Sequence, residues 1–428
     1  MRLIDEILSD SNIDRAILQV KRNKGVSGVD KMTVDEYFYK HRREIRYSIL
    51  NKKYKPQSVK RVYIPKPNGK KRPLGIPTVV DRVIQQAVAQ VLMKKLDSSF
   101  SEFSYGFRPG RSAQMAVLKT LEYINEGYDW VIDLDIEAYF DTVNHDKLIS
   151  ILREKNMNDS TTLHLIRKFM QAGIMEDGLV KPSRIGVPQG GPLSPIISNV
   201  YLDKFDKELE NRGLRFVRYA DDCNIFVKSE MSANRVMKSV TSWLERKLFL
   251  KVSATKTKVV RPPESKFLGF TYLQRNGVWK CKPSNQSKMK LYDKCRKELV
   301  RRIGIARPIA VTFKRINQIV VGWINYYRIG VMKYFVDVFG QWLRHKIRVI
   351  ILKQWKKPKR IYINLQKLNK KLRCLFTDEQ IFSVANTRLG LYRQANGHVV
   401  NFLLSPKILA IKKKERPGLV NPLNYYLS

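Results

Sequence analysis

Residues 214–227 of this 428-residue chain read Leu214-Arg-Phe-Val-Arg-Tyr-Ala-Asp-Asp-Cys-Asn-Ile-Phe-Val227. Two apolar, strand-forming runs flank a pair of adjacent carboxylates, a pattern that predicts a β-hairpin with Asp221 and Asp222 at its tip. Neighbouring carboxylates at a tight turn repel each other, so an external cation is the natural way to stabilise them. Mg²⁺ and similar hard cations are bound by a few such carboxylates. Taken alone, the stretch also fits an exposed acidic turn, and the rest of the chain decides between the two.

A third carboxylate belongs to an earlier strand-like run. Residues 130–136 alternate, which places Asp133 and Asp135 on one face of a predicted strand. A carboxylate in such a core-like run is costly unless it is paired or metal-bound. We interpret Asp133 as a structural or supporting acid. Asp135 is interpreted as a metal ligand, because the acidic turn needs a third carboxylate to complete a two-metal site.

The charge balance indicates a polyanionic partner. The chain has 81 Lys and Arg against 38 Asp and Glu, a formal net charge of +43. From Lys280 to the end it has 33 basic and 6 acidic residues, so most acids lie in the first two thirds. Such a field favours nucleic acid over the alternative, an anionic membrane surface. The basic final third is expected to clamp phosphates.

Cysteine spacing and the chain start indicate a cytoplasmic protein. The four cysteines show neither close pairing nor His partners at zinc spacing, so free thiols are expected at Cys223, Cys281, Cys295 and Cys374. The first residues carry no apolar signal segment. No apolar run approaches the ~20 residues that a bilayer crossing requires.

Residues 59–76 predict a basic β-hairpin. A strand-like run ends at a Pro-Lys-Pro-Asn-Gly-Lys turn, and a second basic run follows it. The hairpin is either a solvated surface element or a flap that meets a triphosphate. In the second case Arg72 would fork two oxygens and Lys66 would act as a point charge. This segment alone does not separate the two.

Two loops carry residue types suited to a ligand. The turn-rich loop 104–112 contains Arg108 and Arg111, and it is either a nucleotide-side or template-side contact or a packed connector. A later loop, which enters a helix, contains Gly190 and Gly191. This glycine pair leaves space for a flat or phosphate-bearing group to approach the backbone.

The final third interleaves basic and aromatic residues at helical spacing. Residues 313–327 and 334–355 predict two helices whose aromatic stripes are most simply core. Arg344 and Arg348 remain for solvent or phosphates. Before these helices, Gly269 lies in a short predicted strand and permits close backbone approach.

The motifs occur in one order: the acid-ended strand with Phe140-Asp141, the Pro188–Pro195 loop, the Tyr-Ala-Asp-Asp hairpin, a Lys-Thr segment and Phe-Leu-Gly-Phe. In this order they resemble the bacterial group II intron-encoded reverse transcriptases, or maturases, of the compact class without an endonuclease domain. The resemblance covers essentially the whole chain and includes Gly322-Trp-Ile-Asn-Tyr-Tyr327.

The resemblance implies an α+β fold of the right-hand polymerase type. Fingers and palm, with an antiparallel sheet flanked by helices, would occupy residues 1–280. An α-helical thumb, the maturase domain, would occupy 281–357, and a small helical DNA-binding segment 358–428. The implied activity is RNA-directed DNA polymerase, together with assistance to intron splicing and retrohoming.

The resemblance also implies roles for single residues. Two Mg²⁺ ions, with Mn²⁺ as an alternative, would be held by Asp135, Asp221, Asp222 and the backbone carbonyl of Ile136. The dNTP-binding residues would be Lys66, Arg72, Phe140, Gln189 and Lys256. Of these, Phe140 would be a steric gate against the 2′-hydroxyl, and Lys256 would protonate pyrophosphate. We assign nucleic-acid contacts to Arg108, Arg111, Gly190, Gly191, Gly269, Arg344 and Arg348.

The expected partners are an RNA template with a DNA or RNA primer, dNTPs, group II intron RNA and target DNA. They would meet a monomer or weak dimer in the bacterial cytoplasm, at the nucleoid or in a ribonucleoprotein. No Cys-pair and His-rich nuclease region follows the thumb, so we expect no target-strand cleavage by this chain. Two alternatives stay open. One is a splicing cofactor with a vestigial polymerase, and the other is a domesticated reverse transcriptase in phage defence or CRISPR adaptation.

Overall fold

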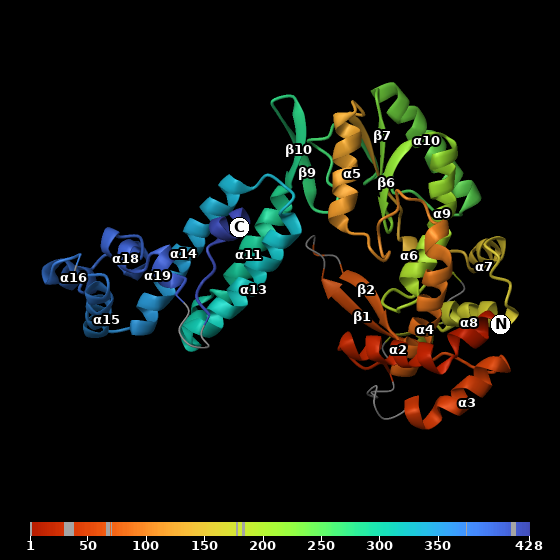
Figure 1. Cartoon of the computed structure of the whole chain (residues 1–428), viewed down its shortest axis with the longest axis horizontal. Coiled ribbons are helices and arrows are strands. Elements are labelled where there is room, and N and C mark those ends of the chain that lie inside the picture. The colour runs from red at the N-terminus through yellow and green to blue at the C-terminus, as the bar shows by residue number, and fades with distance from the viewer. Residues whose placement is uncertain are drawn as a thin grey trace. The chain divides into compact units, whose positions relative to one another are not determined.

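The computed structural model divides the chain into two compact units, residues 1–267 and 268–428 (Figure 1). It describes residues 2–29, 38–65, 69, 71–176, 179–181, 185–373, 375–411 and 417–428, without the side chains of 38–40, 72 and 181. The first unit mixes sheets with helices and the second is mainly helical, which confirms the predicted α+β class.

The first unit alternates helical and strand segments along the described residues. Its strands are β1 Val59–Pro65, β2 Lys71–Ile76, β3 Trp130–Asp135, β4 Ile174–Glu176, β5 Leu179–Lys181, β6 Arg215–Tyr219, β7 Asp222–Val227 and β8 Lys258–Val260. Its helices are α1 Leu3–Ile7, α2 Asp10–Arg22, α3 Phe38–Leu50, α4 Val79–Leu96, the 3₁₀ turn η1 Asp97–Ser99, α5 Ala113–Asn125, α6 Tyr139–Thr142, α7 His145–Glu154, α8 Ser160–Gln171, α9 Ser194–Asn211 and α10 Glu230–Lys247.

One antiparallel sheet, ordered β6-β7-β3-β8, carries the predicted acidic residues. The hairpin predicted from residues 214–227 is therefore confirmed as β6 and β7. Apolar residues are buried on both faces of the two strands, with Phe216 and Ile225 on one face and Val217 and Phe226 on the other. A hairpin enclosed on both faces accounts for the continuous apolar runs that the sequence shows here.

A second sheet has the order β2-β1-β4-β5. The pair β1–β2 is antiparallel, which confirms the hairpin predicted over residues 59–76, whereas β1 and β4 run parallel. The tip of this hairpin, residues 66–68 and 70, lies outside the described residues.

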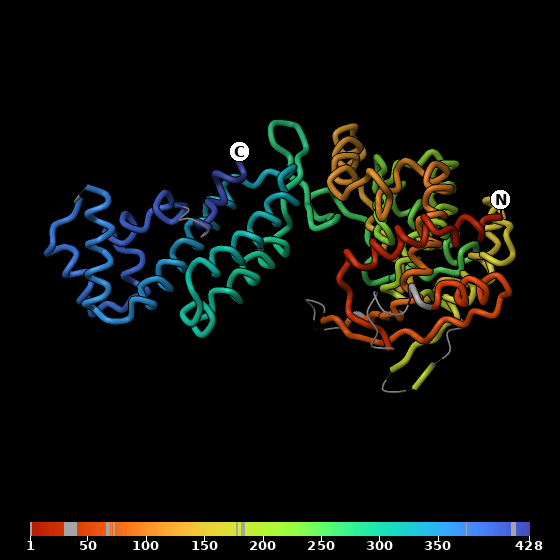
Figure 2. The backbone as a smooth tube through the Cα atoms, turned by 60° about the horizontal axis from the view of Figure 1, so that its bottom comes forward, coloured from red at the N-terminus to blue at the C-terminus, as the bar shows by residue number. Residues whose placement is uncertain are grey.

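The helices of the first unit pack on one another, and α5, α9 and α10 also pack on the β6-β7-β3-β8 sheet. The helix α4 packs on α9, and its apolar side includes Val88 and Leu92, both buried. The N-terminal helices α1 and α2 lie against α4, and α3 lies against α8 (Figure 2). Together these helices bury the core from which the strand ends and their loops project.

The second unit starts with a hairpin and continues as helices. The hairpin is β9 Phe270–Arg275 and β10 Val278–Pro283. The helices are α11 Asn285–Glu298, α12 Arg301–Ala306, α13 Ile309–Tyr327, α14 Lys333–Trp355, α15 Pro358–Lys371, α16 Asp378–Ala385, α17 Leu391–Gln394, α18 His398–Leu403, α19 Pro406–Leu409 and α20 Pro422–Leu427.

The boundary between the units falls after Phe267, earlier than the predicted end of the first domain at residue 280. The β9–β10 hairpin packs on the helices that follow it. The ring of Phe270 lies 4.8 Å from that of Tyr327 in α13, and Ser284, directly after β10, caps α11. A further division of the second unit at residue 357 stays a prediction.

Other predictions concern thiols and membranes. Cys223, Cys281 and Cys295 are free and buried, as predicted, while Cys374 lies outside the described residues. Burial raises the pKa of the Cys281 thiol to about 11, so this thiol is protonated at neutral pH. Along the described part of the chain, no helix has both the length and the hydrophobicity that a bilayer crossing requires.

Candidate active site

Asp221 and Asp222 lie at the turn between β6 and β7. Tyr219 pairs with Asp222 in the strand register, so Ala220 and Asp221 form a two-residue loop. Ala220 adopts a left-handed φ of 60°, a conformation that costs a non-glycine residue roughly 1–2 kcal/mol. Neighbouring residues must therefore hold this turn in place.

An earlier loop lies directly against the turn. A Cβ atom built on Gly106 would be 2.3 Å from the Ala220 nitrogen and 3.0 Å from the Tyr219 carbonyl carbon. Only glycine fits at such a close approach of two backbones. The Gly106 carbonyl also accepts a 2.9 Å hydrogen bond from Asn199 Nδ2 of α9. The loop is thereby attached both to the turn and to a buried helix.

Asp135, the last residue of β3, is the direct cross-strand neighbour of Asp222 in the β3–β7 ladder. Side chains at such paired positions have Cβ atoms roughly 5 Å apart. The register therefore places Asp135 beside the Asp221-Asp222 turn, as predicted. Their joint role as metal ligands stays a prediction.

The carboxylates of this sheet perturb one another. Low-dielectric surroundings and the neighbouring charges of Asp133, Asp221 and Asp135 raise the pKa of Asp222 to about 7, although its side chain reaches solvent. Burial also raises the pKa of Asp133. Asp133 Oδ1 accepts hydrogen bonds from Ser265 Oγ (2.7 Å) and Asn224 Nδ2 (2.8 Å). These contacts fit the supporting role predicted for Asp133.

The donor set suits a hard divalent cation, which prefers carboxylate oxygens. A cation among these carboxylates would relieve the repulsion that raises the Asp222 pKa. Within the described ranges, no group of three or more Asp, Glu, His or Cys side chains already forms a metal cage. The residues at this turn thus fit a divalent ion.

Two further predicted residues adjoin Asp135. Lys256 Nζ donates to Asp135 Oδ1 at 2.8 Å, so this lysine contacts a predicted metal ligand. Ile136 forms an isolated bridge with Val252 through the Asp135 carbonyl and the Glu137 amide. The bridge does not use the Ile136 carbonyl, which suits its predicted role as a backbone ligand.

A cavity of about 280 Å³ joins the segments predicted to bind dNTP. Arg61 of β1, Gly75 of β2, Asp141 of α6 and Gln189 of the loop before α9 line it. The Gly75 amide donates to the Gln189 carbonyl at 2.7 Å, which holds the loop against β2. The volume of the cavity is near the lower limit for small-molecule sites, roughly 300 Å³. Arg61 is a lining cation to which the sequence analysis gave no such role.

Phe140 lies in the single-turn helix α6, which follows the left-handed Ala138. Its carbonyl accepts a 2.6 Å hydrogen bond from the Val187 amide of the cavity loop. The side chain is half-buried, and the gate role stays a prediction. Lys66 lies outside the described residues, and only the backbone of Arg72 is described. Their contacts with a triphosphate therefore stay predictions.

Comparison with known proteins identifies the family. A model described as reverse transcriptase (RNA-dependent DNA polymerase) matches residues 64–272, and one described as the group II intron maturase-specific domain matches residues 288–372. Protein YkfC of Escherichia coli K12 is 32% identical over 273 residues, which cover 55% of this chain and 71% of YkfC. The chain belongs to the group II intron reverse transcriptase/maturase family.

Other similar proteins are matched over smaller parts of their length. The group II intron-encoded protein LtrA of Lactococcus lactis subsp. cremoris is 39% identical over 199 residues, 46% of this chain and 33% of LtrA. A solved chain of a partial Cas6-RT-Cas1–Cas2 complex is 26% identical with a TM-score of 0.39, over 57% of this chain and 43% of that chain. A TM-score this low supports no argument from shape. The chain spans a third of LtrA, so whole-protein activities of such relatives are proposals for it.

The structure overturns the nucleic-acid contact predicted for Arg108 of this reverse transcriptase. Its side chain is buried and pairs with Asp97 Oδ1 at 2.7 Å. Its guanidinium also donates to the carbonyls of Ser101, Ser104 and Asp97. Four of its five N–H donors bind inside the protein and the side chain is 3% exposed, so Arg108 fastens the 101–110 loop and is not available to nucleic acid.

The structure also overturns the nucleic-acid contact predicted for Arg348. It is buried in the second unit, where it donates to the Leu404 carbonyl at 3.1 Å and to Asn401 Oδ1. Burial, with the nearby charge of Arg344, lowers the pKa of Arg348 to about 10. Arg348 therefore joins α14 to α18 and to its C-cap residue, Leu404. Arg344 is half-buried and Arg111 is partly exposed above the Tyr105 ring, so their roles stay predictions.

The three glycines assigned to nucleic acid are approached by the protein itself. A Cβ on Gly190 would be 2.6 Å from the Gly75 carbonyl oxygen, and one on Gly191 would be 2.2 Å from Gln85 Oε1. One on Gly269 would be 2.5 Å from the Tyr327 hydroxyl. Internal packing thus accounts for all three glycines, and the predicted ligand contacts are not needed to explain them.

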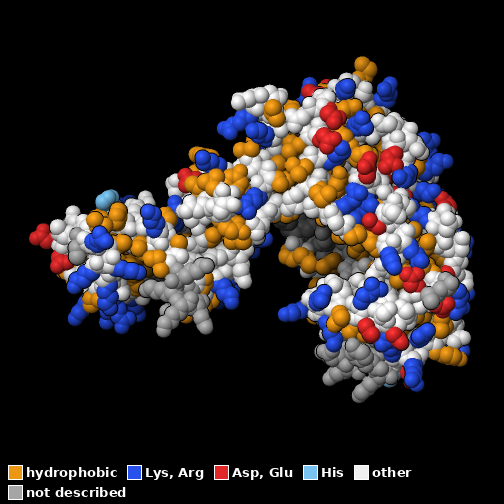
Figure 3. All heavy atoms as spheres, viewed as in Figure 1, with side chains coloured by type: hydrophobic (Ala, Val, Ile, Leu, Met, Phe, Trp, Pro, Cys, Tyr) orange, Lys and Arg blue, Asp and Glu red, His pale blue; other side chains and the backbone are white. Residues whose placement is uncertain are grey.

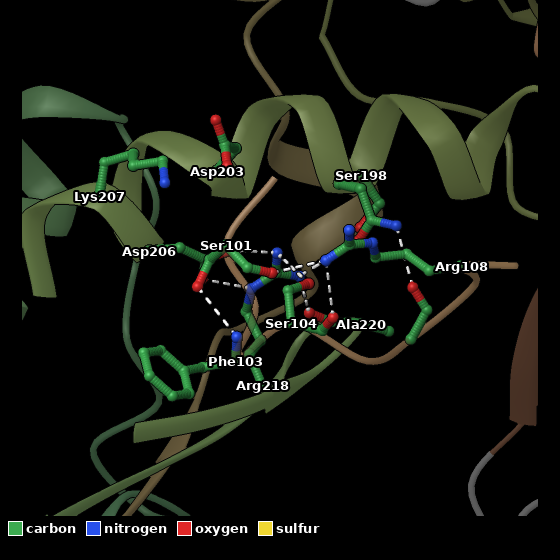
Figure 4. A network of polar contacts seen from close by, with 12 residues as sticks. Ser101, Phe103, Ser104, Arg108, Ser198, Asp203, Asp206, Lys207, Arg218 and Ala220 are labelled. Atoms are coloured by element: carbon green, nitrogen blue, oxygen red, sulfur yellow. Dashed lines mark hydrogen bonds and ion pairs between the residues drawn. The ribbon is translucent and has the colours of Figure 1, made fainter. Parts of the chain in front are cut away.

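The sequence analysis missed a buried network behind the acidic turn (Figure 4). Arg218 is 1% exposed, and it forks onto Asp206 of α9, which is fully buried, at 2.6 and 2.5 Å. The sequence did contain a signal for this network. Arg218 follows directly on two apolar strand residues, and Asp206 lies on the apolar side of the predicted helix that became α9. Burial raises the pKa of Asp206 although Arg218 opposes the shift.

Proposed function

We propose that this chain is an RNA-directed DNA polymerase that copies RNA into cDNA and binds its group II intron RNA to assist splicing and retrohoming. The observation that carries the polymerase is the β3–β7 register, which sets Asp135 beside Asp222 at the Asp221-Asp222 turn. The matched reverse transcriptase and maturase models support the two parts of the proposal.

Metal binding is proposed at the three carboxylates. Asp135, Asp221 and Asp222 would hold two Mg²⁺ ions. When bound, such ions activate a primer hydroxyl and neutralise charge on the triphosphate and the leaving pyrophosphate. The protein contributes the fixed geometry of the hairpin and a close group of carboxylates. The pKa of Asp222 is about 7, so its carboxyl group loses its proton and becomes available to a cation as the pH rises past that value.

Nucleotide binding is proposed at the 280 Å³ cavity. Arg61 supplies a charge for phosphate oxygens, and Gln189 supplies an amide at the cavity wall. Phe140 is proposed to lie under the sugar and exclude a 2′-hydroxyl. Lys66 and Arg72 are proposed to contact the triphosphate from the β1–β2 hairpin. Lys256, already beside Asp135, is proposed to donate a proton to the leaving pyrophosphate.

An RNA template, a primer, intron RNA and target DNA are the proposed macromolecular partners. Lys and Arg side chains lie over both units on the face shown in Figure 3. The formal net charge of +43 supports binding dominated by phosphates. RNA affinity should therefore fall steeply with salt, and a flat salt response would remove this part of the proposal. We also propose a cytoplasmic location, on RNA or at the nucleoid.

Extension of a DNA primer on an RNA template, with dNTPs and Mg²⁺, tests the polymerase. We expect the wild type to extend, and a variant with both Asp221→Asn and Asp222→Asn to lose extension while it keeps its RNA affinity. A folded wild type that extends no primer would sink the polymerase. A splicing cofactor without polymerase would instead assist intron splicing as the wild type, while that same wild-type protein extends no primer.

A further inference from the structure

The Ala220 carbonyl receives a hydrogen bond from a charge buried two residues earlier. Arg218 Nη1 donates to it at 2.8 Å. This carbonyl belongs to the peptide group that precedes Asp221, so its direction sets the orientation of the Asp221 backbone. Ala220 is the left-handed residue of the turn. A strained peptide group is thus held by a side chain that has almost no contact with solvent.

The remaining donors of Arg218 are fixed by two other parts of the first unit. Its Nε and Nη2 atoms bind Asp206 of α9, and Nη2 also donates to Ser104 Oγ at 2.8 Å. Asn199 Oδ1 of α9 lies 3.3 Å from Nη1. The side chain therefore cannot move without breaking charge-assisted bonds in a dry environment.

The backbone of Arg218 is held by the same loop. Its amide donates to the Phe103 carbonyl at 2.9 Å, and its carbonyl accepts the Tyr105 amide at 2.9 Å. The loop thus grips β6 immediately before the turn, while Gly106 lies against the turn itself. Side chain and backbone of one arginine join α9, the loop and the acidic hairpin.

We propose that Arg218, braced by Asp206, is a positioning residue that sets the Asp221-Asp222 turn for divalent metal. The proposal rests on the proposed polymerase function for its kinetic readout only, because metal binding can be measured without it. Groups that orient metal ligands typically change metal affinity by roughly 10–100-fold when they are altered.

The decisive variants keep charge and size close to the wild type. Arg218→Lys retains the positive charge beside Asp206 but cannot reach Asp206, Ser104 and the Ala220 carbonyl at once. Asp206→Asn keeps the shape of the brace and removes its charge. Each has a matched control. Arg108→Lys alters a buried arginine of the same loop that does not contact Ala220, and Asp203→Asn alters a buried acid of α9 that pairs with Lys155 at 2.5 Å.

Mn²⁺ binding, followed by electron paramagnetic resonance, and melting temperature are measured on all four variants of the full chain. We expect Arg218→Lys and Asp206→Asn to weaken Mn²⁺ binding by at least about tenfold. The controls should lose similar thermal stability and keep wild-type Mn²⁺ affinity. In primer extension, the first two should lower kcat at saturating metal and leave the KM for dNTP near the wild-type value, because the nucleotide cavity is built from other segments.

Equal Mn²⁺ affinity in Arg218→Lys and Arg108→Lys would overturn the positioning role. If both decisive variants fail to fold, Ser104→Ala removes one contact of Arg218, and unchanged Mn²⁺ affinity in that variant would equally overturn it. A wild type that binds Mn²⁺ but extends no primer would refute the polymerase alone.

Discussion

Replacing Gly106 by alanine should displace the acidic turn without touching an acid. The new Cβ would be 2.3 Å from the Ala220 nitrogen, whereas real Cβ contacts under 3.0 Å are essentially never seen. Loop and turn must therefore separate by roughly 1 Å to reach ordinary contact distance. Overpacking of this kind costs about 1–3 kcal/mol, which lowers the melting temperature by several degrees.

The kinetic consequence should be larger than the loss of stability. A displacement of about 1 Å at reacting groups can cost roughly 100-fold in rate. We expect Gly106→Ala to lower kcat for single-nucleotide extension by that order, in an assay with an RNA template and saturating dNTP. The melting temperature, recorded on the same protein, shows how much fold is retained.

Gly110→Ala is the matched control in the same loop. Gly110 has a φ of 70°, and no atom lies within 4 Å of the position that a Cβ would take there, so alanine brings backbone strain without a clash. It should lower stability by about 1 kcal/mol and leave kcat unchanged. Wild-type kcat in Gly106→Ala, or an equal loss in both variants, would refute the reasoning.

Three further predictions concern other contacts. Lys256→Met removes the exposed ion pair with Asp135, which is worth up to about 1 kcal/mol. Because Lys256 and a metal ion would compete for the Asp135 carboxylate, Mn²⁺ titrations should show binding tighter by up to about fivefold. Weaker or unchanged binding would contradict this competition. Phe140→Ala should incorporate ribonucleotides when they compete with dNTPs, and unchanged sugar selectivity would refute the steric-gate role of Phe140. Burial lowers the pKa of His145, although its hydrogen bond to the Gly186 carbonyl opposes the shift. The unfolded chain therefore binds the extra proton first, and the free energy of unfolding should fall as pH drops below about 6.5. Denaturant titrations should show a smaller fall in His145→Gln, and an identical fall would exclude His145 as its source.

The local pattern of the sequence was enough to predict the acid-bearing strands. The alternation around Asp135 corresponds to β3, and the two apolar runs within residues 214–227 correspond to β6 and β7, because both patterns depend only on neighbouring residues. The register that sets Asp135 beside Asp222 joins segments far apart in the chain. Before the structure, it was indicated by the requirement for a third carboxylate and by the resemblance to reverse transcriptases, not by any local pattern.

The environment of single arginines could not be predicted in the same way. Arg108 is buried because Asp97 and three carbonyls surround it, and Arg348 because Asn401 and Leu404 do. The counter-ion of Arg108 lies 11 residues away and the partners of Arg348 lie 53 and 56 residues away, so the spacing of neighbouring residues does not distinguish these arginines from exposed ones. The internal neighbours of the glycines were not predictable from local sequence for a related reason, since Gly190 and Gly191 make room for β2 and α4, which are distant in the chain.

Backbone strain shows that the acidic turn depends on particular neighbouring residues as well as on its own carboxylates. Ala138 follows β3 with a φ of 46°, and Ala220 follows β6 with a φ of 60°. Such residues persist only where surrounding structure over-determines them. The Ala138 carbonyl accepts the Asp141 amide at 2.8 Å, a support supplied within three residues. The Ala220 carbonyl instead depends on Arg218, whose counter-ion belongs to α9. The geometry of the acidic turn therefore depends on contacts from β6, α9 and the 101–110 loop together, whereas the turn at Ala138 is held by its own neighbours.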